Sequence, residues 1–86
     1  MPTVSRFFGI AIRIYYDDHA PFNFHVYYGE EAATVDIETL RVRSGRVSRR
    51  ALALVLEWAA DHRDELFEDW RLAETHQPLN PIDPLE

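Results

Sequence analysis

Residues 10–29, IAIRIYYDDHAPFNFHVYYG, decide the fold because two β-forming stretches flank a short turn. In residues 10–16 the branched residues alternate with others, so one face of a strand carries the isoleucines Ile10, Ile12 and Ile14. Pro21 and Asn23 supply turn chemistry. Residues 24–28 return as a second strand of the same alternating type. The stretch therefore predicts an antiparallel hairpin with one apolar face and one polar face.

The flanking residues extend this sheet in both directions. Residues 1–9 hold a short apolar run that we expect to form an edge strand or an arm before Gly9. Residues 33–37 read as a third strand with Val35 and Ile37 on the apolar face. Residues 41–47 predict a short fourth strand or a hairpin end at Ser44-Gly45. The sequence thus favours three or four antiparallel strands.

A long helix is expected after the sheet. Ser48 is a suitable N-cap, because its hydroxyl can accept from the free N–H groups of the first helical turn. Apolar residues follow at helical spacing, and they are Leu52, Val55, Leu56, Ala59, Leu66, Trp70 and Ala73. We expect one helix to about Glu74, or a helix that is broken near His62-Arg63, where the apolar stripe is weakest. At ~1.5 Å per residue it would measure about 40 Å, longer than a small sheet can cover.

The C-terminal residues QPLNPIDPLE have a period of three. Prolines at 78, 81 and 84 are each followed by an apolar residue, which is typical of a polyproline II segment with one apolar stripe. The segment can be a clasp over the protein's own helix or a docking peptide for a partner. Because the far end of the helix needs a cover, the partner-binding candidates are Phe67, Trp70, Leu79, Ile82 and Leu85.

These elements predict an α+β fold: a three- to four-stranded antiparallel sheet packed on one long C-terminal helix. We expect a single domain over residues 1–77 and an extended Pro-rich tail over residues 78–86. With no cysteine, the chain has no disulfide, thiolate zinc site or thiol nucleophile. No stretch approaches the ~20 apolar residues of a membrane span, and we expect a cytoplasmic protein without a cofactor.

Charge is unevenly distributed along the chain. The net charge is −6, but residues 1–50 hold seven Arg against six acids, whereas residues 51–86 hold two Arg against nine acids. The protein as a whole is therefore a poor nucleic-acid binder. A local anion site is still possible just before and inside the first helical turn, where the candidates are Arg46, Ser48, Arg49 and Arg50. The alternative is that these arginines lie on the solvent-exposed face of the helix and pair with acidic side chains.

The polar face of the sheet is the candidate site for chemistry. If the strands pair as a meander, this face carries Arg13, Tyr15, Asp17, His25, Tyr27, Thr34 and Asp36. An ordinary solvated face is one interpretation. In an enzyme, His25 would be the base, Tyr27 a positioning group and Arg13 a phosphate clamp, with Asp17 beside them. His19 and His25 with Asp17 or Asp18 match no established metal motif, and we expect no metal.

The sequence also resembles a small bacterial family known as domain of unknown function 4160. The resemblance covers nearly the whole chain and rests on short motifs: Phe8-Gly9-Ile10, Tyr15-Tyr16, Asp18-His19, Pro21, Phe24-His25, Tyr28-Gly29, Arg50-Ala51-Leu52 and Glu57-Trp58. Members usually carry a further histidine two positions before His25, where this chain has Asn23. The resemblance implies a gene beside that of a second small protein, in an arrangement similar to toxin–antitoxin pairs.

The combined expectation is a non-enzymatic partner-binding protein of a two-protein bacterial module. Its partner would be a second small protein or another copy of the same chain. The alternatives are a small nuclease-like toxin that uses the polar sheet face and a nucleic-acid-binding transcriptional regulator. The regulator is the weakest of these, because the predicted helix is acidic along its second half.

Overall fold

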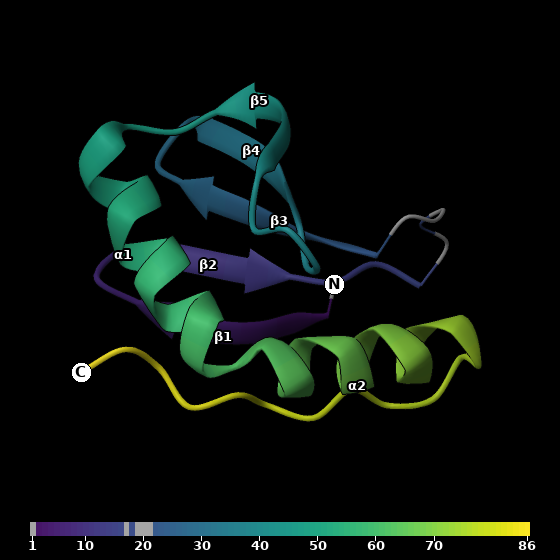
Figure 1. The fold of residues 1–86 in the computed structure, drawn as a ribbon. Helices are drawn as coiled ribbons and strands as arrows, with labels where there is room; N and C mark the ends of the chain where they lie inside the picture. Colours follow the sequence, from purple (N-terminus) through teal and green to yellow (C-terminus); the bar gives the residue numbers. More distant parts are fainter. Residues whose placement is uncertain (1, 17, 19–21) are drawn as a thin grey trace.

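The fold is α+β, with a five-stranded antiparallel sheet covered on one side by two helices (Figure 1). The computed structural model describes residues 2–16, 18 and 22–86. The strands are β1 (Thr3–Phe7), β2 (Ile10–Arg13), β3 (Asn23–Tyr28), β4 (Glu31–Asp36) and β5 (Val42–Arg46). The helices are α1 (Arg49–Asp61) and α2 (Arg63–Glu74). The α+β class was predicted, but the expected three or four strands and single long helix were wrong in number.

The sheet is a simple meander in which each strand pairs with the next, in the order β1-β2-β3-β4-β5. The turn between β1 and β2 consists of Phe8 and Gly9, both at positive φ (51° and 80°). This is the backbone of the two-residue hairpins whose twist suits adjacent strands. The tight turn pairs Phe7 with Ile10, and so the residues before Gly9 form a full edge strand.

The helical region is interrupted at His62, where α1 ends and α2 begins. The His62 backbone has φ −123° and ψ 21°. The His62 Nδ1 atom lies 2.6 Å from Glu65 Oε1, so the side chain engages the first turn of α2. His62-Arg63 is the point where the apolar spacing is weakest in the sequence. The break redirects the chain, and Leu66, Trp70 and Ala73 are therefore buried rather than projecting past the sheet.

Trp58 is the centre of the core. Its side chain is fully buried and its ring packs against Phe7, with ring centroids 5.3 Å apart, and against Phe24 at 6.3 Å. The predicted apolar stripe did not include Trp58 and counted Leu52 and Leu56, which are only half-buried. The observed stripe on α1 is Ala51, Val55, Trp58 and Ala59, so it is rotated from the predicted one.

The C-terminal tail packs against its own domain. In Figure 1 it turns back after α2, runs along that helix and passes β1. The Ile82 N–H donates to the Val4 carbonyl over 2.7 Å, so the tail also covers part of the β1 edge. The Trp58 indole N–H donates to the Asp83 carbonyl over 2.7 Å. Ile82 is 3% exposed, which makes it a core residue.

Candidate functional site

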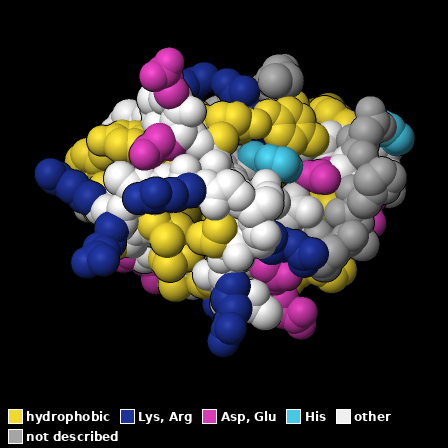
Figure 2. Space-filling view, turned by 90° about the horizontal axis from the view of Figure 1, so that it is seen from above, with side chains coloured by type: hydrophobic (Ala, Val, Ile, Leu, Met, Phe, Trp, Pro, Cys, Tyr) yellow, Lys and Arg dark blue, Asp and Glu magenta, His cyan; other side chains and the backbone are white. Residues whose placement is uncertain are grey.

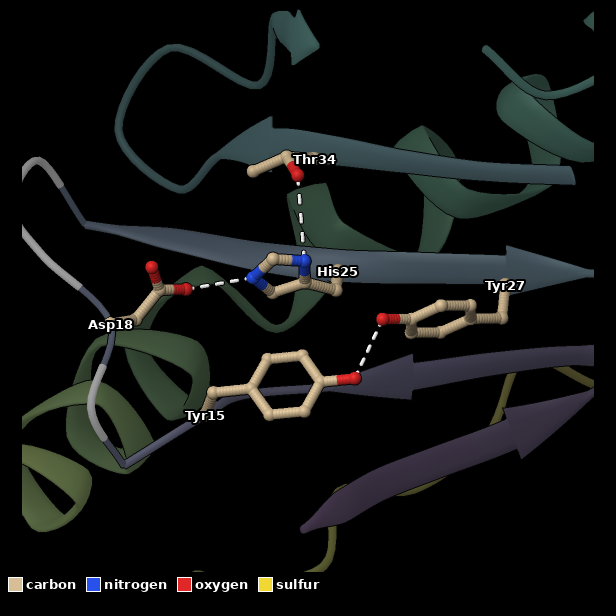
Figure 3. Close-up of polar contacts among 5 residues, drawn as sticks. All are labelled: Tyr15, Asp18, His25, Tyr27 and Thr34. Atoms are coloured by element: carbon tan, nitrogen blue, oxygen red, sulfur yellow. Dashed lines mark hydrogen bonds and ion pairs between the residues drawn. The ribbon is translucent and has the colours of Figure 1, made fainter. Parts of the chain in front are cut away.

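The polar face of the sheet carries a connected row of polar side chains. The strand register places Thr3 opposite Arg13, Arg13 opposite His25, His25 opposite Thr34 and Thr34 opposite Ser44. One residue from each of the five strands contributes to this row. The flanking residues Ile12, Val26 and Val35 point into the core, so alternation directs the polar row away from the helices. Figure 3 shows the site with the helices behind the sheet.

His25 lies at the middle of the row and has a partner on each ring nitrogen. Its Nε2 atom lies 2.7 Å from Asp18 Oδ2, and its Nδ1 atom lies 3.4 Å from Thr34 Oγ1 (Figure 3). The Tyr15 ring meets the imidazole edge-on, with centroids 4.6 Å apart. His25 and Asp18 are each about one quarter exposed, at 22% and 24% of the side chain. The imidazole is thus held in place yet accessible to solvent.

Two tyrosines and an arginine adjoin the histidine. The Tyr15 and Tyr27 hydroxyl oxygens lie 2.6 Å apart. This hydrogen bond, with burial as a smaller cause, raises the pKa of the Tyr27 phenol above its usual value. The Arg13 guanidinium carbon lies 4.7 Å from the Tyr27 ring centroid, and its Nε donates to Thr3 Oγ1 over 3.3 Å. Among the described residues, a ring and a hydroxyl group therefore orient Arg13.

The structure brings three of the predicted catalytic candidates together: Arg13, His25 and Tyr27. The fourth, Asp17, lies outside the described residues, as does His19. The carboxylate that contacts His25 is Asp18, which the sequence reasoning named only for metal binding. The alternation of the strands already placed Tyr15 and Thr34 on this face, but it could not show that they contact His25 and Tyr27.

Asp36 belongs to the same face and has a structural role. Its Oδ1 accepts from the Thr39 N–H over 2.9 Å, and its Oδ2 lies 3.4 Å from Arg43 Nη1. The Thr39 backbone hydrogen bond is the main reason that the pKa of the Asp36 carboxyl is lowered. Asp36 thus closes the turn between β4 and β5 and is not part of the His25 cluster.

The cluster has the groups to bind an anion and to exchange a proton. Arg13 offers guanidinium N–H donors, and His25 is a ring that can take or give a proton. A shallow hollow of about 240 Å³ lies beside them, lined by His25, Ala32, Ala33, Thr34, Ser44 and Gly45. Within the described part of the chain, no group of three His, Cys, Asp or Glu side chains could hold a metal ion.

The anion candidates at the start of α1 do not form one site. Ser48 Oγ accepts from the Ala51 N–H over 3.3 Å, which confirms the predicted N-cap. The Ser48 N–H in turn donates to Glu31 Oε1 over 2.9 Å, so a carboxylate of the chain itself already lies at this helix end. Arg46 stands opposite Ala32 on the sheet, whereas Arg50 lines a separate groove. Arg49 is exposed on the first turn.

That groove lies between the first hairpin and α1 and has a volume of about 420 Å³. Its lining is mostly apolar: Phe8, Ile10, Tyr28, Arg50, Ala51 and Leu54. Phe8 is 61% exposed and Tyr28 is 37% exposed, so two large aromatic side chains border the groove in contact with water. The sequence alone did not indicate this groove, because Phe8 reads as one more apolar residue of an edge strand.

The partner-binding candidates at the other end contact the protein itself. Trp70 and Ile82 are buried, and Phe67, Leu79 and Leu85 are half-buried against the core. Phe22 packs edge-on against Phe67 and Trp70, with ring centroids 5.2 and 5.8 Å apart. The chain therefore covers its own aromatic helix end, and a role of these residues in partner binding stays a prediction.

The fold and the site define a small α+β domain with one helix-covered sheet face and one open polar face. The chain belongs to the family described as domain of unknown function DUF4160, whose profile matches residues 9–71. The match includes Arg13, His25, Tyr27 and Thr34, and it leaves out β1 and the tail. No curated protein and no solved structure matches the chain. None of the described helices is both long and apolar enough to cross a membrane.

Proposed function

We propose that this protein is a non-enzymatic, partner-binding member of a two-protein module, and that the groove beside Phe8 is its docking surface. The main support for the proposal is the conformation and exposure of Phe8. It stands in the left-handed region at φ 51°, a conformation that costs an ordinary residue of order 1 kcal/mol, and yet it is 61% exposed. Neither hairpin geometry nor core packing accounts for a phenylalanine there, because asparagine or glycine suits this turn better.

The composition of the groove is that of a binding hot spot. Exposed aromatic side chains and arginine dominate binding energies at protein interfaces, where they are desolvated together. Phe8 and Tyr28 supply the rings, Ile10 and Leu54 form the apolar floor, and Arg50 borders the rim. Burying one such aromatic side chain is worth roughly 1.5–3 kcal/mol or more. Two of them would contribute about 3–6 kcal/mol, and the rest of the contact must offset the cost of association.

The occupant that fits is a segment of a different protein, with an apolar side chain beside a carboxylate. Arg50 has no ion pair within the described residues, so its guanidinium is available to such a carboxylate. A second copy fits less well. A symmetric dimer through this patch would bring two Arg50 side chains to the same interface, and like charges that face each other are destabilising.

The test compares wild type with Phe8→Asn in binding to the partner. Tagged wild-type protein is used to isolate the partner from the native host, and the purified pair is then titrated by calorimetry. We expect Phe8→Asn to weaken binding at least tenfold. The same variant should melt no lower than wild type, because asparagine tolerates the positive φ of the turn. Val42→Thr is the matched control, since Val42 is 40% exposed on β5 and outside the groove.

Two results would overturn the proposal. The first is a partner that binds the Phe8→Asn variant as tightly as wild type. The second is a strictly monomeric wild-type protein at high concentration, measured by light scattering, with no protein that co-purifies from the host. If binding depended on Trp70 or Ile82 and not on Phe8, the docking surface would be the helix end and tail, and the groove would have no role.

A further inference from the structure

We propose a second binding site, on the open polar face of the sheet, for single-stranded nucleic acid. This inference concerns a different surface from the groove and does not depend on it. It is the surface that a nuclease-like toxin or a nucleic-acid-binding regulator would use. Three observations carry it: the arrangement of arginines on the face, the stacking groups between them, and the shallow hollow at its centre.

The arginines lie at both ends of a row across the sheet. The register places Arg6 opposite Ala11, Ala11 opposite Tyr27, Tyr27 opposite Ala32 and Ala32 opposite Arg46. This row runs next to the one that contains Arg13 and His25. Ala11 and Ala32 are small, so they leave space on either side of the Tyr27 ring between the two terminal cations. Figure 2 shows arginine side chains spread over the side of the molecule on which β5 lies.

Their guanidinium groups are available to phosphate. Among the residues that the structure describes, the carboxylates of this face have partners, because Asp18 contacts His25 and Asp36 contacts Arg43. Among the described residues, Arg6, Arg13 and Arg46 have no ion pair. The protein as a whole is acidic, with a net charge of −6, so any affinity for phosphate must come from a local group of arginines such as this one. Phosphate contacts by arginine supply most of the affinity of such complexes.

Between the arginines lie groups on which bases can stack. Tyr15 and Tyr27 are half-buried, and Arg13 extends over the Tyr27 ring at 4.7 Å. Unpaired bases stack on aromatic rings and on guanidinium planes, and each stacked base is worth about 1–3 kcal/mol. The hollow of about 240 Å³ beside His25 leaves room above Ala32 and Thr34. A flat sheet face with rings and cations suits single strands better than a duplex, which needs an element that enters a groove.

The test is fluorescence anisotropy with labelled 12-nucleotide oligouridine and oligodeoxythymidine. We expect the full-length protein to bind either strand more tightly than a duplex of the same length. Three phosphate contacts give a slope of log K against log salt of about −2, at about −0.7 per phosphate. This corresponds to a loss of about 20-fold between 50 and 200 mM salt. The tighter of the two strands identifies the natural ligand class.

The decisive variant is the double substitution Arg6→Gln and Arg46→Gln. Both side chains are exposed and have no ion pair among the residues described, so the fold should be retained, as checked by the melting temperature. We expect at least a tenfold loss of binding and a slope reduced to about −0.7, the value for one remaining phosphate. Arg63→Gln on α2 is the matched control and should bind as wild type.

A separate variant examines the stacking groups. Tyr27→Leu keeps an apolar body but removes the ring over which Arg13 lies, and it should weaken binding with the salt slope unchanged. The proposal is overturned if neither oligonucleotide binds at 50 mM salt, or if Arg63→Gln costs as much as the double variant. It is also overturned if poly-L-glutamate competes as effectively as a single strand of equal charge, because the face would then recognise an acidic protein.

Discussion

Replacing Ile82 by alanine should show that the tail is part of the folded domain. Ile82 is 3% exposed and belongs to the core, and its N–H donates to the Val4 carbonyl. Truncation of a buried isoleucine to alanine costs about 2–5 kcal/mol. A domain of this length has a total stability of roughly 4–13 kcal/mol. The expected loss of about 3 kcal/mol is therefore a large fraction of the stability, although the changed side chain lies only four residues before Glu86.

The measurement is urea unfolding followed by tryptophan fluorescence, since Trp58 and Trp70 are both buried. A loss of about 3 kcal/mol lowers the melting temperature by roughly 12–24 °C in a domain of this size. Asn80→Ala is the matched control. The Asn80 side chain is exposed, and the hydrogen bond at this position comes from its backbone N–H to Asp69 Oδ1, at 2.8 Å. The reasoning is refuted if Ile82→Ala costs less than about 0.5 kcal/mol, the range typical of surface changes.

Three further predictions concern stability. Burial raises the pKa of the Asp69 carboxyl, so the folded protein favours the neutral carboxyl. The stability that the neutral form contributes is lost as pH rises through the raised folded pKa. The melting temperature of wild type relative to Asp69→Asn should thus fall between pH 4 and pH 8. Trp58→Phe removes the indole N–H bonded to the Asp83 carbonyl and should cost about 1 kcal/mol for that bond, plus a cavity cost, in urea unfolding. Gly45→Ala should lower the melting temperature by several degrees, because a Cβ there would lie 2.3 Å from the Ala32 carbonyl oxygen and φ is +76°.

Features set by neighbouring residues were predictable from the sequence. The alternation of Ile10, Ile12 and Ile14 determines which face of β2 is buried, and the structure has all three in the core. The Ser48 cap depends only on its own hydroxyl and the N–H groups of the next turn. The same local rule placed Arg13, His25 and Tyr27 on one face, because a strand with one buried face fixes the direction of every other side chain.

Features that depend on distant residues were not predictable. The indole N–H of Trp58 donates to the Asp83 carbonyl, 25 residues away, so the partner that allows this polar atom to be buried could not follow from helical spacing. Asp69 is a charged residue of the acidic half of the helix, yet it is fully buried and accepts from the Asn80 N–H of the tail. The weak apolar spacing at His62-Arg63 indicated where the helix could break, but the way the second helix buries Trp70 depends on tertiary contacts.

The two proposed surfaces meet at one end of the sheet, and this has a functional consequence. Tyr27 of the polar row and Tyr28 of the groove are consecutive, and Arg6 lies two residues before Phe8. A partner seated on the groove with a carboxylate for Arg50 therefore lies close to the Arg6 end of the row. Negative charge on that partner lowers the affinity of the face for phosphate. An acidic partner should thus weaken the binding of single-stranded nucleic acid, and by linkage the nucleic acid should weaken the binding of the partner by the same factor.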